Sequence, residues 1–233
     1  MLARAAFLRP VVDFIFPESC LGCSESGTVF CQSCLKNLPQ AKLRCLKCAA
    51  SNPFGRYCLN CKTKFSPSSV RSCFALNGLC REAIHHFKYE DATCYAPAFA
   101  DALATLIKEI PGFSDFKLVF IPLAGSSHRK RGYNQAELLA RYVGAKLGLK
   151  VEEVLTRRES ANSQVQSGSK QARRKNVRGV FTASVKVPSY VIVIDDVITT
   201  GATVEEATKV LIESGASSVY AVSLAMADFE RRI

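Results

Sequence analysis

Residues 191–203, which read VIVIDDVITTGAT, decide the fold of this chain. The stretch opens with β-branched apolar residues, and such a run predicts a strand over 190–194 in the middle of a parallel sheet covered on both faces. Asp195 and Asp196 follow the strand, and a turn rich in threonine leads into a helix predicted from Thr203. Packing alone does not account for this order of strand, acidic pair, turn and helix.

The chemistry of the same stretch suits a phosphorylated ribose. Ligands of an open parallel sheet bind beyond the carboxyl ends of its strands, and N–H groups at the start of a helix attract phosphate. Ionised carboxylates accept hydrogen bonds from two neighbouring sugar hydroxyls. The residues predicted to bind this ligand are Asp195, Asp196, Thr199, Thr200, Gly201, Ala202 and Thr203. The alternative is a core strand and a capped helix with two incidental acids between them.

Strand and helix signals alternate through the last two thirds of the chain. The predicted helices cover 83–87, 96–110, 134–147 and 203–214, and the predicted strands cover 118–123, 190–194 and 218–226. Thr203 and Glu206 have the spacing of a capping box for the last helix, and Gly215 marks its end. This alternation predicts an α/β fold, with a parallel sheet and helices on both of its faces.

One stretch, 156–178, breaks this pattern. It contains seven Lys or Arg residues and a single acid, Glu159. A long basic stretch in a compact domain predicts a loop with a function, although a solvated charged surface is the alternative.

The composition predicts a globular protein with phosphate-rich partners. The chain has 233 residues, of which 48% are hydrophobic, and its formal net charge is +11. Such a charge favours nucleic acid or phosphorylated metabolites without choosing between them, and a basic surface that only keeps the protein soluble is the alternative. No apolar run reaches the roughly 20 residues of a membrane span. We predict an amphipathic lead-in helix over 1–16 rather than a signal peptide, because Arg9, Pro10 and Asp13 interrupt its apolar residues, and a cytoplasmic location.

Eight of the eleven cysteines form four Cys-x-x-Cys pairs. The pairs are Cys20 and Cys23, Cys31 and Cys34, Cys45 and Cys48, and Cys58 and Cys61. Two such pairs complete a tetrahedral four-sulfur shell, so four pairs suit two structural zinc ions. The gaps favour one site over 20–34 and another over 45–61, and interleaved pairing and a redox dithiol are the alternatives. Cys73, Cys80 and Cys94 are assigned to packing.

Further motifs accompany these features and support a resemblance. They are FKY at 87–89, IPL at 121–123, RGYNQAELLA at 131–140 and RRKN at 173–176 ahead of Phe181. Residues 195–203 look like the signature for phosphoribosyl pyrophosphate (PRPP) in type I phosphoribosyltransferases. With the paired cysteines, these motifs make nearly the whole chain resemble the ComF family, which is associated with natural competence and DNA utilisation.

The resemblance implies a type I phosphoribosyltransferase domain over 70–233 behind a double zinc ribbon over 17–65. In that fold pyrophosphate binds at 122–126, and the stretch 156–178 corresponds to a flexible lid, which matches loosely around Gly168. The candidates for the pyrophosphate site and the lid are Ala124, Gly125, Arg129, Arg131, Arg173 and Arg174. Mg²⁺ would bind together with PRPP.

Three functions follow from this reading. In the first, the protein supports DNA uptake in the cytoplasm, binds PRPP or a related compound and single-stranded DNA, and works with a helicase or recombination proteins. Tyr133 or Phe181 would then stack on bases. In the second, it is an active phosphoribosyltransferase of nucleotide salvage, although no acceptor pocket is recognisable. In the third, it is a zinc-ribbon adaptor with a vestigial PRPP fold. The three histidines, His85, His86 and His128, form no catalytic or metal set by their spacing.

Overall fold

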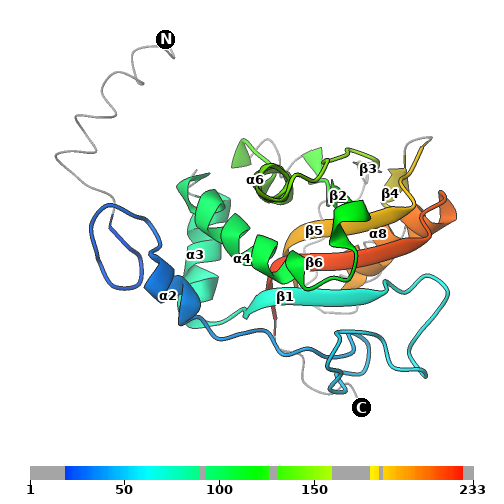
Figure 1. The fold of residues 1–233 in the computed structure, drawn as a ribbon, viewed down its shortest axis with the longest axis horizontal. Coiled ribbons are helices and arrows are strands. Elements are labelled where there is room, and N and C mark those ends of the chain that lie inside the picture. The colour runs from blue at the N-terminus through cyan, green and yellow to red at the C-terminus, as the bar shows by residue number, and fades with distance from the viewer. Residues whose placement is uncertain (1–18, 90–92, 126–130, 159–178, 184–185, 228–233) are drawn as a thin grey trace, which may run out of the picture.

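A computed structural model describes residues 19–89, 93–125, 131–158, 179–183 and 186–227 (Figure 1). Several predictions fall outside these residues. They concern the lead-in helix over 1–16, most of the basic loop, and Arg129, Arg173 and Arg174. Within the described part of the chain, no helix is long and apolar enough to cross a membrane.

A four-stranded parallel sheet forms the centre of the molecule, with the strand order β1-β6-β5-β2. A small antiparallel pair, β3 and β4, lies apart from it. The strands are β1 (Ser69–Ala75), β2 (Lys117–Phe120), β3 (Leu155–Arg157), β4 (Phe181–Ala183), β5 (Tyr190–Ile198) and β6 (Ser218–Met226). The helices are α2 (Gln32–Lys36), α3 (Gly78–Tyr89), α4 (Ala96–Lys108), α6 (Gln135–Leu147) and α8 (Ala202–Glu213), with short 3-10 turns η1 (Thr93–Tyr95) and η2 (Phe113–Asp115).

Strand β5 shows why the sheet is covered on both faces. Its side chains alternate between the two faces, as in any strand. Ile192 and Ile194 pack in the cluster that includes α3, α4 and α6, whereas Val191 and Val193 pack in the cluster that includes α8 (Figure 1). All four side chains are fully buried. This arrangement, with the cysteine module ahead of it, confirms the predicted fold class.

The element containing the acidic pair differs from the prediction in two ways. Strand β5 does not stop before Asp195 but continues through the pair to Ile198, because residues 195, 197 and 198 keep their register with β6. The predicted capping box is wrong, since the N-cap of α8 is Gly201 and it makes no side-chain cap bond. The carboxylate of Glu206 accepts a hydrogen bond from the backbone N–H of Gly179 at 2.7 Å instead.

Other boundaries differ by a few residues. Strand β6 has the predicted bounds, and α6 begins after Asn134, whose side chain caps it. Helix α3 is longer than the predicted 83–87, and β2 is shorter than the predicted 118–123. Strands β1, β3 and β4 were not predicted.

The cysteine module shares its core with the α/β domain. Phe30, Leu35 and Leu38 from its first half pack in the same cluster as α3 and α4. Leu46 and Tyr57 from its second half pack in a cluster with the end of β5 and the start of α8. The module therefore has little apolar core of its own.

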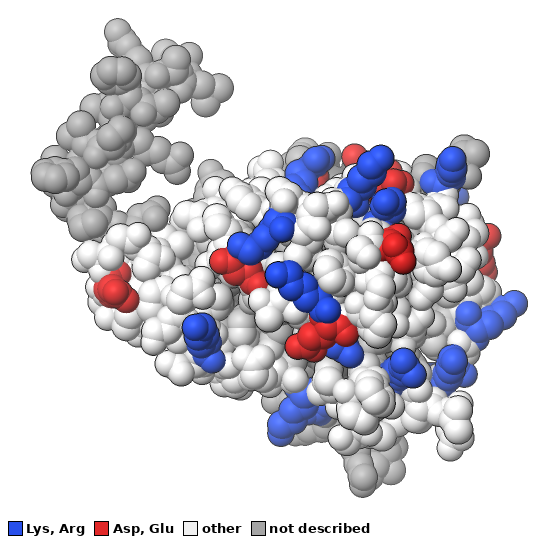
Figure 2. Space-filling model, viewed as in Figure 1, with Lys and Arg blue, Asp and Glu red and all other residues white. Residues whose placement is uncertain are grey.

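Charges of both signs are interspersed over the face drawn in Figure 2. The excess of positive charge therefore forms no single continuous patch among the described residues of that face.

Candidate functional site

A cleft of about 170 Å³ lies at the carboxyl end of the parallel sheet, where β5 and the residues after β2 meet. The acidic pair, Asp195 and Asp196, lies in it, and the chain segment 121–123 forms part of its wall. The other polar residues that line it are Lys88, Arg131, Asn134, Arg157 and Thr203. We call it the acidic-pair cleft. It has the position that ligands occupy in open parallel sheets.

The two acids have different surroundings. Asp196 is 8% exposed, and its Oδ2 lies 2.8 Å from Nζ of Lys88 at the end of α3. Asp195 is half-buried, and its Oδ1 accepts the N–H of Asp196 at 2.8 Å. Burial and the charge of Asp196 raise the pKa of Asp195 to about 8, although Lys88 opposes the shift. The pair therefore resists full ionisation until more positive charge or sugar hydroxyls approach it.

The raised pKa predicts a pH-dependent stability of the ligand-free protein. Because the folded-state pKa of Asp195 lies above its ordinary value of 3.8, the folded chain binds this proton more tightly than the unfolded chain. Its contribution to stability is complete below about pH 4 and is lost as the pH rises through about 8. Between about pH 6 and pH 8 the parent should lose on the order of 1–2 kcal/mol of its free energy of unfolding through Asp195. The Asp195→Asn variant should not show this loss.

Urea unfolding of the zinc-loaded parent and of the Asp195→Asn variant across this range measures the effect. Asp115→Asn, an exposed aspartate in η2, is the control and should follow the parent. Parallel stability curves for the parent and Asp195→Asn would contradict the assignment.

Three cationic side chains surround the acids. Besides Lys88, they are Arg157 of β3 and Arg131. Burial lowers the pKa of Arg157, and the charge of Asp195 opposes this shift. The guanidinium of Arg131 donates to Oε1 of Gln135 and to the hydroxyl of Tyr89, each at 3.2 Å. Positive groups on several sides of two carboxylates suit a ligand that carries both phosphates and sugar hydroxyls.

The sequence did not assign Lys88 or Asn134 to the site, and it included Arg157 only as part of the basic stretch 156–178. The motif at 87–89 was the signal for Lys88, since it contributed to the family resemblance, but nothing in it indicated a pair with Asp196. Asn134 was expected to start a helix. Its side chain does cap α6, and its Nδ2 also donates to the carbonyl of Ile121 at 3.0 Å, which ties the end of β2 to α6.

The turn over 199–203, which we call the phosphate turn, connects the acids to α8. Gly201 has a φ of +76°, in the left-handed region that glycine adopts without strain. The hydroxyl of Thr200 accepts the N–H of Ala202 at 3.4 Å, and Thr199 is exposed. The structure brings Thr203 and Arg131 into the cleft with the acids, and Ala124 and Gly125 follow the cleft segment 121–123 in the chain.

The two expected base-stacking residues, Tyr133 and Phe181, have different surroundings. Phe181 is only 3% exposed and packs in the core beneath α8. The hydroxyl of Tyr133 donates to the carbonyl of Phe87, and its ring packs edge-on against that phenylalanine. The burial of Phe181 makes its expected stacking on bases wrong, whereas Tyr133 is half-buried and its stacking stays a prediction.

The eight paired cysteines form two separate groups, Cys20, Cys23, Cys31 and Cys34, and Cys45, Cys48, Cys58 and Cys61. In each group the four sulfur atoms lie within 4.8 Å of one another, which confirms the consecutive pairing. We call the two groups, with their turns, the first and second ribbon. The other three cysteines were assigned to packing. Cys73 and Cys80 are buried as expected, but Cys94 is exposed, so its assignment is wrong.

The electrostatics of both groups fit a bound cation. Burial alone would raise the pKa of Cys20, but neighbouring N–H groups, led by that of Cys31, lower it to about 6. Burial and the neighbouring thiols raise the pKa of Cys34 to about 12. The second ribbon repeats the pattern, with a pKa of about 7 at Cys45 and about 12 at Cys61. Four thiolates so close together need a cation, and tetrahedral sulfur sites suit structural zinc.

Comparisons with known proteins agree with these features. The family model of the double zinc ribbon domain matches residues 11–62. Competence protein ComFC of Streptococcus pneumoniae is 28% identical over 209 residues, which cover 89% of this chain and 88% of that protein. Competence protein ComFC of Bacillus subtilis is 28% identical over 83% of this chain and 82% of its own length. DNA utilization protein YhgH of Salmonella typhi is 31% identical over 104 residues, 44% of this chain and 46% of that protein.

Solved structures match at low similarity. Adenine phosphoribosyltransferase of Leishmania tarentolae has a TM-score of 0.36 at 17% identity, over 70% of this chain and 80% of that one. Hypoxanthine phosphoribosyltransferase of Trypanosoma cruzi has a TM-score of 0.35 at 15% identity, over 63% of this chain and 73% of that one.

Proposed function

Because the chain belongs to the ComF family, we propose that it supports DNA uptake in natural transformation, or DNA utilisation, and that it binds PRPP or a related phosphoribosyl compound and single-stranded DNA. We place it in the cytoplasm, where thiols stay reduced and cysteine ligands remain available for zinc. A DNA-uptake helicase or recombination proteins are the protein partners that we propose.

The observation that carries the ligand proposal is the composition of the acidic-pair cleft. Two carboxylates meet Lys88, Arg131 and Arg157 in one pocket, and the phosphate turn begins beside them. Carboxylates are acceptors for the two ribose hydroxyls, and the N–H groups at the start of α8 are donors for the 5′-phosphate. One ligand that contains both groups satisfies the whole set.

Lys88 has a defined part in this proposal. Its ion pair with Asp196 neutralises the more buried acid while no ligand is present. When the ribose hydroxyls bind the acids, Nζ of Lys88 becomes available to the pyrophosphate, together with the guanidinium of Arg131. Mg²⁺ bound with PRPP would add positive charge at the pyrophosphate.

Calorimetric titration with PRPP and Mg²⁺ tests the proposal. We expect the zinc-loaded parent to bind PRPP, and the double variant Asp195→Asn with Asp196→Asn to bind it at least tenfold more weakly, because amides are poorer acceptors for hydroxyls than carboxylates. That loss corresponds to about 1.4 kcal/mol or more. Zinc content should not change, since neither acid belongs to a cysteine group.

Asp115→Asn again serves as the control, because this aspartate is exposed and lies in η2, away from the cleft residues. Equal PRPP affinity in the double variant and the parent would reject the site. No binding by the parent would favour the zinc-ribbon adaptor instead. Release of pyrophosphate on adding a nucleobase to the PRPP complex would assign the second function, that of an active transferase.

A further inference from the structure

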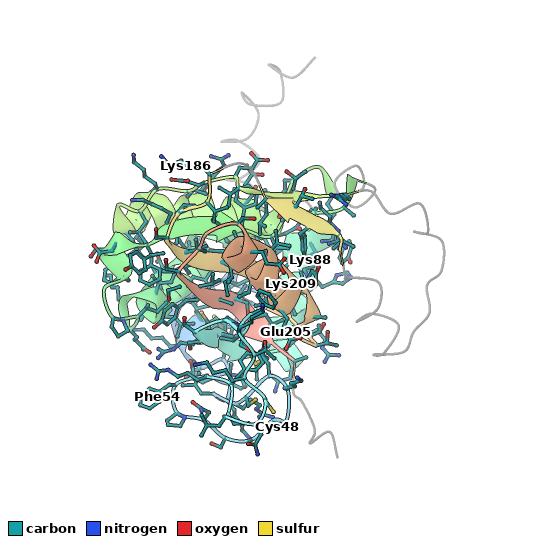
Figure 3. The ribbon with its side chains drawn as sticks, turned by 90° about the vertical axis from the view of Figure 1, so that its right-hand side faces the viewer. Cys48, Phe54, Lys88, Lys186, Glu205 and Lys209 are labelled. Carbon is teal, nitrogen blue, oxygen red and sulfur yellow. The ribbon has the colours of Figure 1, made fainter. Side chains whose placement is uncertain are left out.

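The end of α3 carries an exposed aromatic ring beside the acidic-pair cleft. Tyr89 is 59% exposed, and it directly follows Lys88, which reaches into the cleft (Figure 3). The other large exposed hydrophobic side chains of the described residues are Phe54, Leu59, Tyr142 and Tyr190, and none of them lines the cleft. Tyr89 does not line the cleft itself, but its hydroxyl accepts a hydrogen bond from Arg131, which does, so its exposed ring lies next to the cleft.

The ring of Tyr89 contacts two other planar groups. The imidazole of His85, one helical turn earlier, has its centroid 5.0 Å from that of Tyr89. The guanidinium carbon of Arg131 lies 5.0 Å from the centre of the same ring. Arg131 also lines the acidic-pair cleft. These contacts connect the exposed end of α3 to Arg131, a residue of the cleft.

This combination of groups selects a class of ligand. Exposed aromatic rings and guanidinium planes bind nucleobases by stacking, which contributes about 1–3 kcal/mol per base. The charge of Arg131 suits the phosphate next to a stacked base. A free phosphate would not need the ring, and a free base would not need the arginine. The ligand is therefore a base with an adjacent phosphate.

We propose that Tyr89, His85 and Arg131 form a base-stacking platform at the mouth of the acidic-pair cleft, and that its ligand is single-stranded nucleic acid. The inference rests on the DNA-binding part of the proposed function and gives that binding a location. Single strands are favoured over single nucleotides because the platform offers two neighbouring rings and a guanidinium, and successive bases of one strand can each contact one of these groups.

The absence of tryptophan from the sequence permits a direct test. Tyr89→Trp creates a sole tryptophan whose fluorescence reports a base stacked on it. We expect an oligothymidylate of about twelve nucleotides, within the size of a single-strand site, to quench this fluorescence to saturation. An abasic strand of equal length should leave it nearly unchanged. Tyr142→Trp is the matched control, because Tyr142 is 43% exposed on α6, and it should show no quenching.

Affinity measured by fluorescence polarisation of a labelled oligothymidylate gives a second readout. Stacking worth about 1–3 kcal/mol predicts that Tyr89→Ala binds roughly 5- to 150-fold more weakly, and Tyr89→Phe should retain most of the parent affinity. Tyr142→Ala should bind like the parent. PRPP affinity is measured beside it, because Tyr89→Ala also removes the side chain that holds Arg131, whose guanidinium is proposed to meet the pyrophosphate.

The outcomes are distinguishable. If the parent binds the oligothymidylate and Tyr89→Ala binds it equally well, the platform is rejected and the proposed function stands. If the parent binds no oligothymidylate, both the platform and the DNA-binding part of the proposed function are rejected. Quenching by thymidine monophosphate at the same concentrations as by the strand would overturn the assignment to single strands.

Discussion

Cys45→Ser is expected to remove one zinc ion and to weaken PRPP binding at least tenfold, whereas Cys23→Ser should remove the other zinc ion with little change in PRPP affinity. The difference follows from what each ribbon touches. Cys45 is fully buried, and Leu46 after it contacts Gly201 in the phosphate turn. Cys23 is exposed in the first ribbon, which packs against α3 and α4 instead.

Two further contacts hold the second ribbon against α8. The hydroxyl of Tyr57 donates to Oε1 of Glu205 in the first turn of α8 at 2.8 Å. Cys45, Leu46 and Tyr57 share a buried cluster with Ile198 and Val204, which stand on either side of the phosphate turn. Figure 3 shows Cys48 of the second ribbon beyond Glu205, on the side away from Lys88. Loss of the second zinc should therefore loosen the turn that is proposed to bind the 5′-phosphate.

Zinc content measured by native mass spectrometry, and PRPP affinity measured by calorimetry, check this expectation. Leu46→Ala is the control for unfolding of the second ribbon in Cys45→Ser, because it keeps all eight cysteine ligands and both zinc ions. It should still weaken PRPP binding, since it removes the contact with Gly201. Parent-like PRPP affinity in both Cys45→Ser and Leu46→Ala would show that the second ribbon does not support the turn.

The sequence allowed the centre of the fold to be predicted because its strands are buried on both faces. Strands β5 and β6 are largely apolar runs. In a chain that also has helical segments between its strands, such a run is best explained as a buried strand of a parallel sheet. Strand β1 was missed because it contains Arg71 and three residues of Ser or Cys. The guanidinium of Arg71 reaches Glu109 at 3.0 Å, and Ser72 bonds to Ser223 of β6 at 2.5 Å. Such polar residues obscure a strand until its partners are known.

The candidate site was predictable only in part, and for a related reason. The acids and the turn could be predicted because they are neighbours in the sequence, at 195–203. Lys88 belongs to a helix far from β5 in the chain, and no local pattern reports that it pairs with Asp196. The contact between Leu46 and Gly201 joins two modules that composition suggests are separate. Long-range contacts of single side chains leave no periodic signal in a sequence.

Gly201→Ala is expected to destabilise the protein by about 2–5 kcal/mol and to abolish most PRPP binding. A left-handed conformation costs a residue with a side chain about 1–2 kcal/mol, and the φ of Gly201 is +76°. A Cβ at this position would lie 2.8 Å from Cδ1 of Leu46, so the buried side chain of Leu46 or the turn must shift. Overpacking of this kind costs about 1–3 kcal/mol more.

Gly148→Ala is the matched control, because its φ of +69° is similar and a Cβ there would meet nothing within 4 Å. Urea unfolding with zinc present should show that Gly201→Ala loses more stability than Gly148→Ala, and the difference isolates the contact with Leu46. Adding Leu46→Ala to Gly201→Ala should reduce that difference, because the clash is removed while the backbone strain remains. Equal losses of stability in the two glycine variants would mean that Leu46 does not constrain the phosphate turn. Binding of zinc to the second ribbon would then not support PRPP binding through the contact between Leu46 and Gly201.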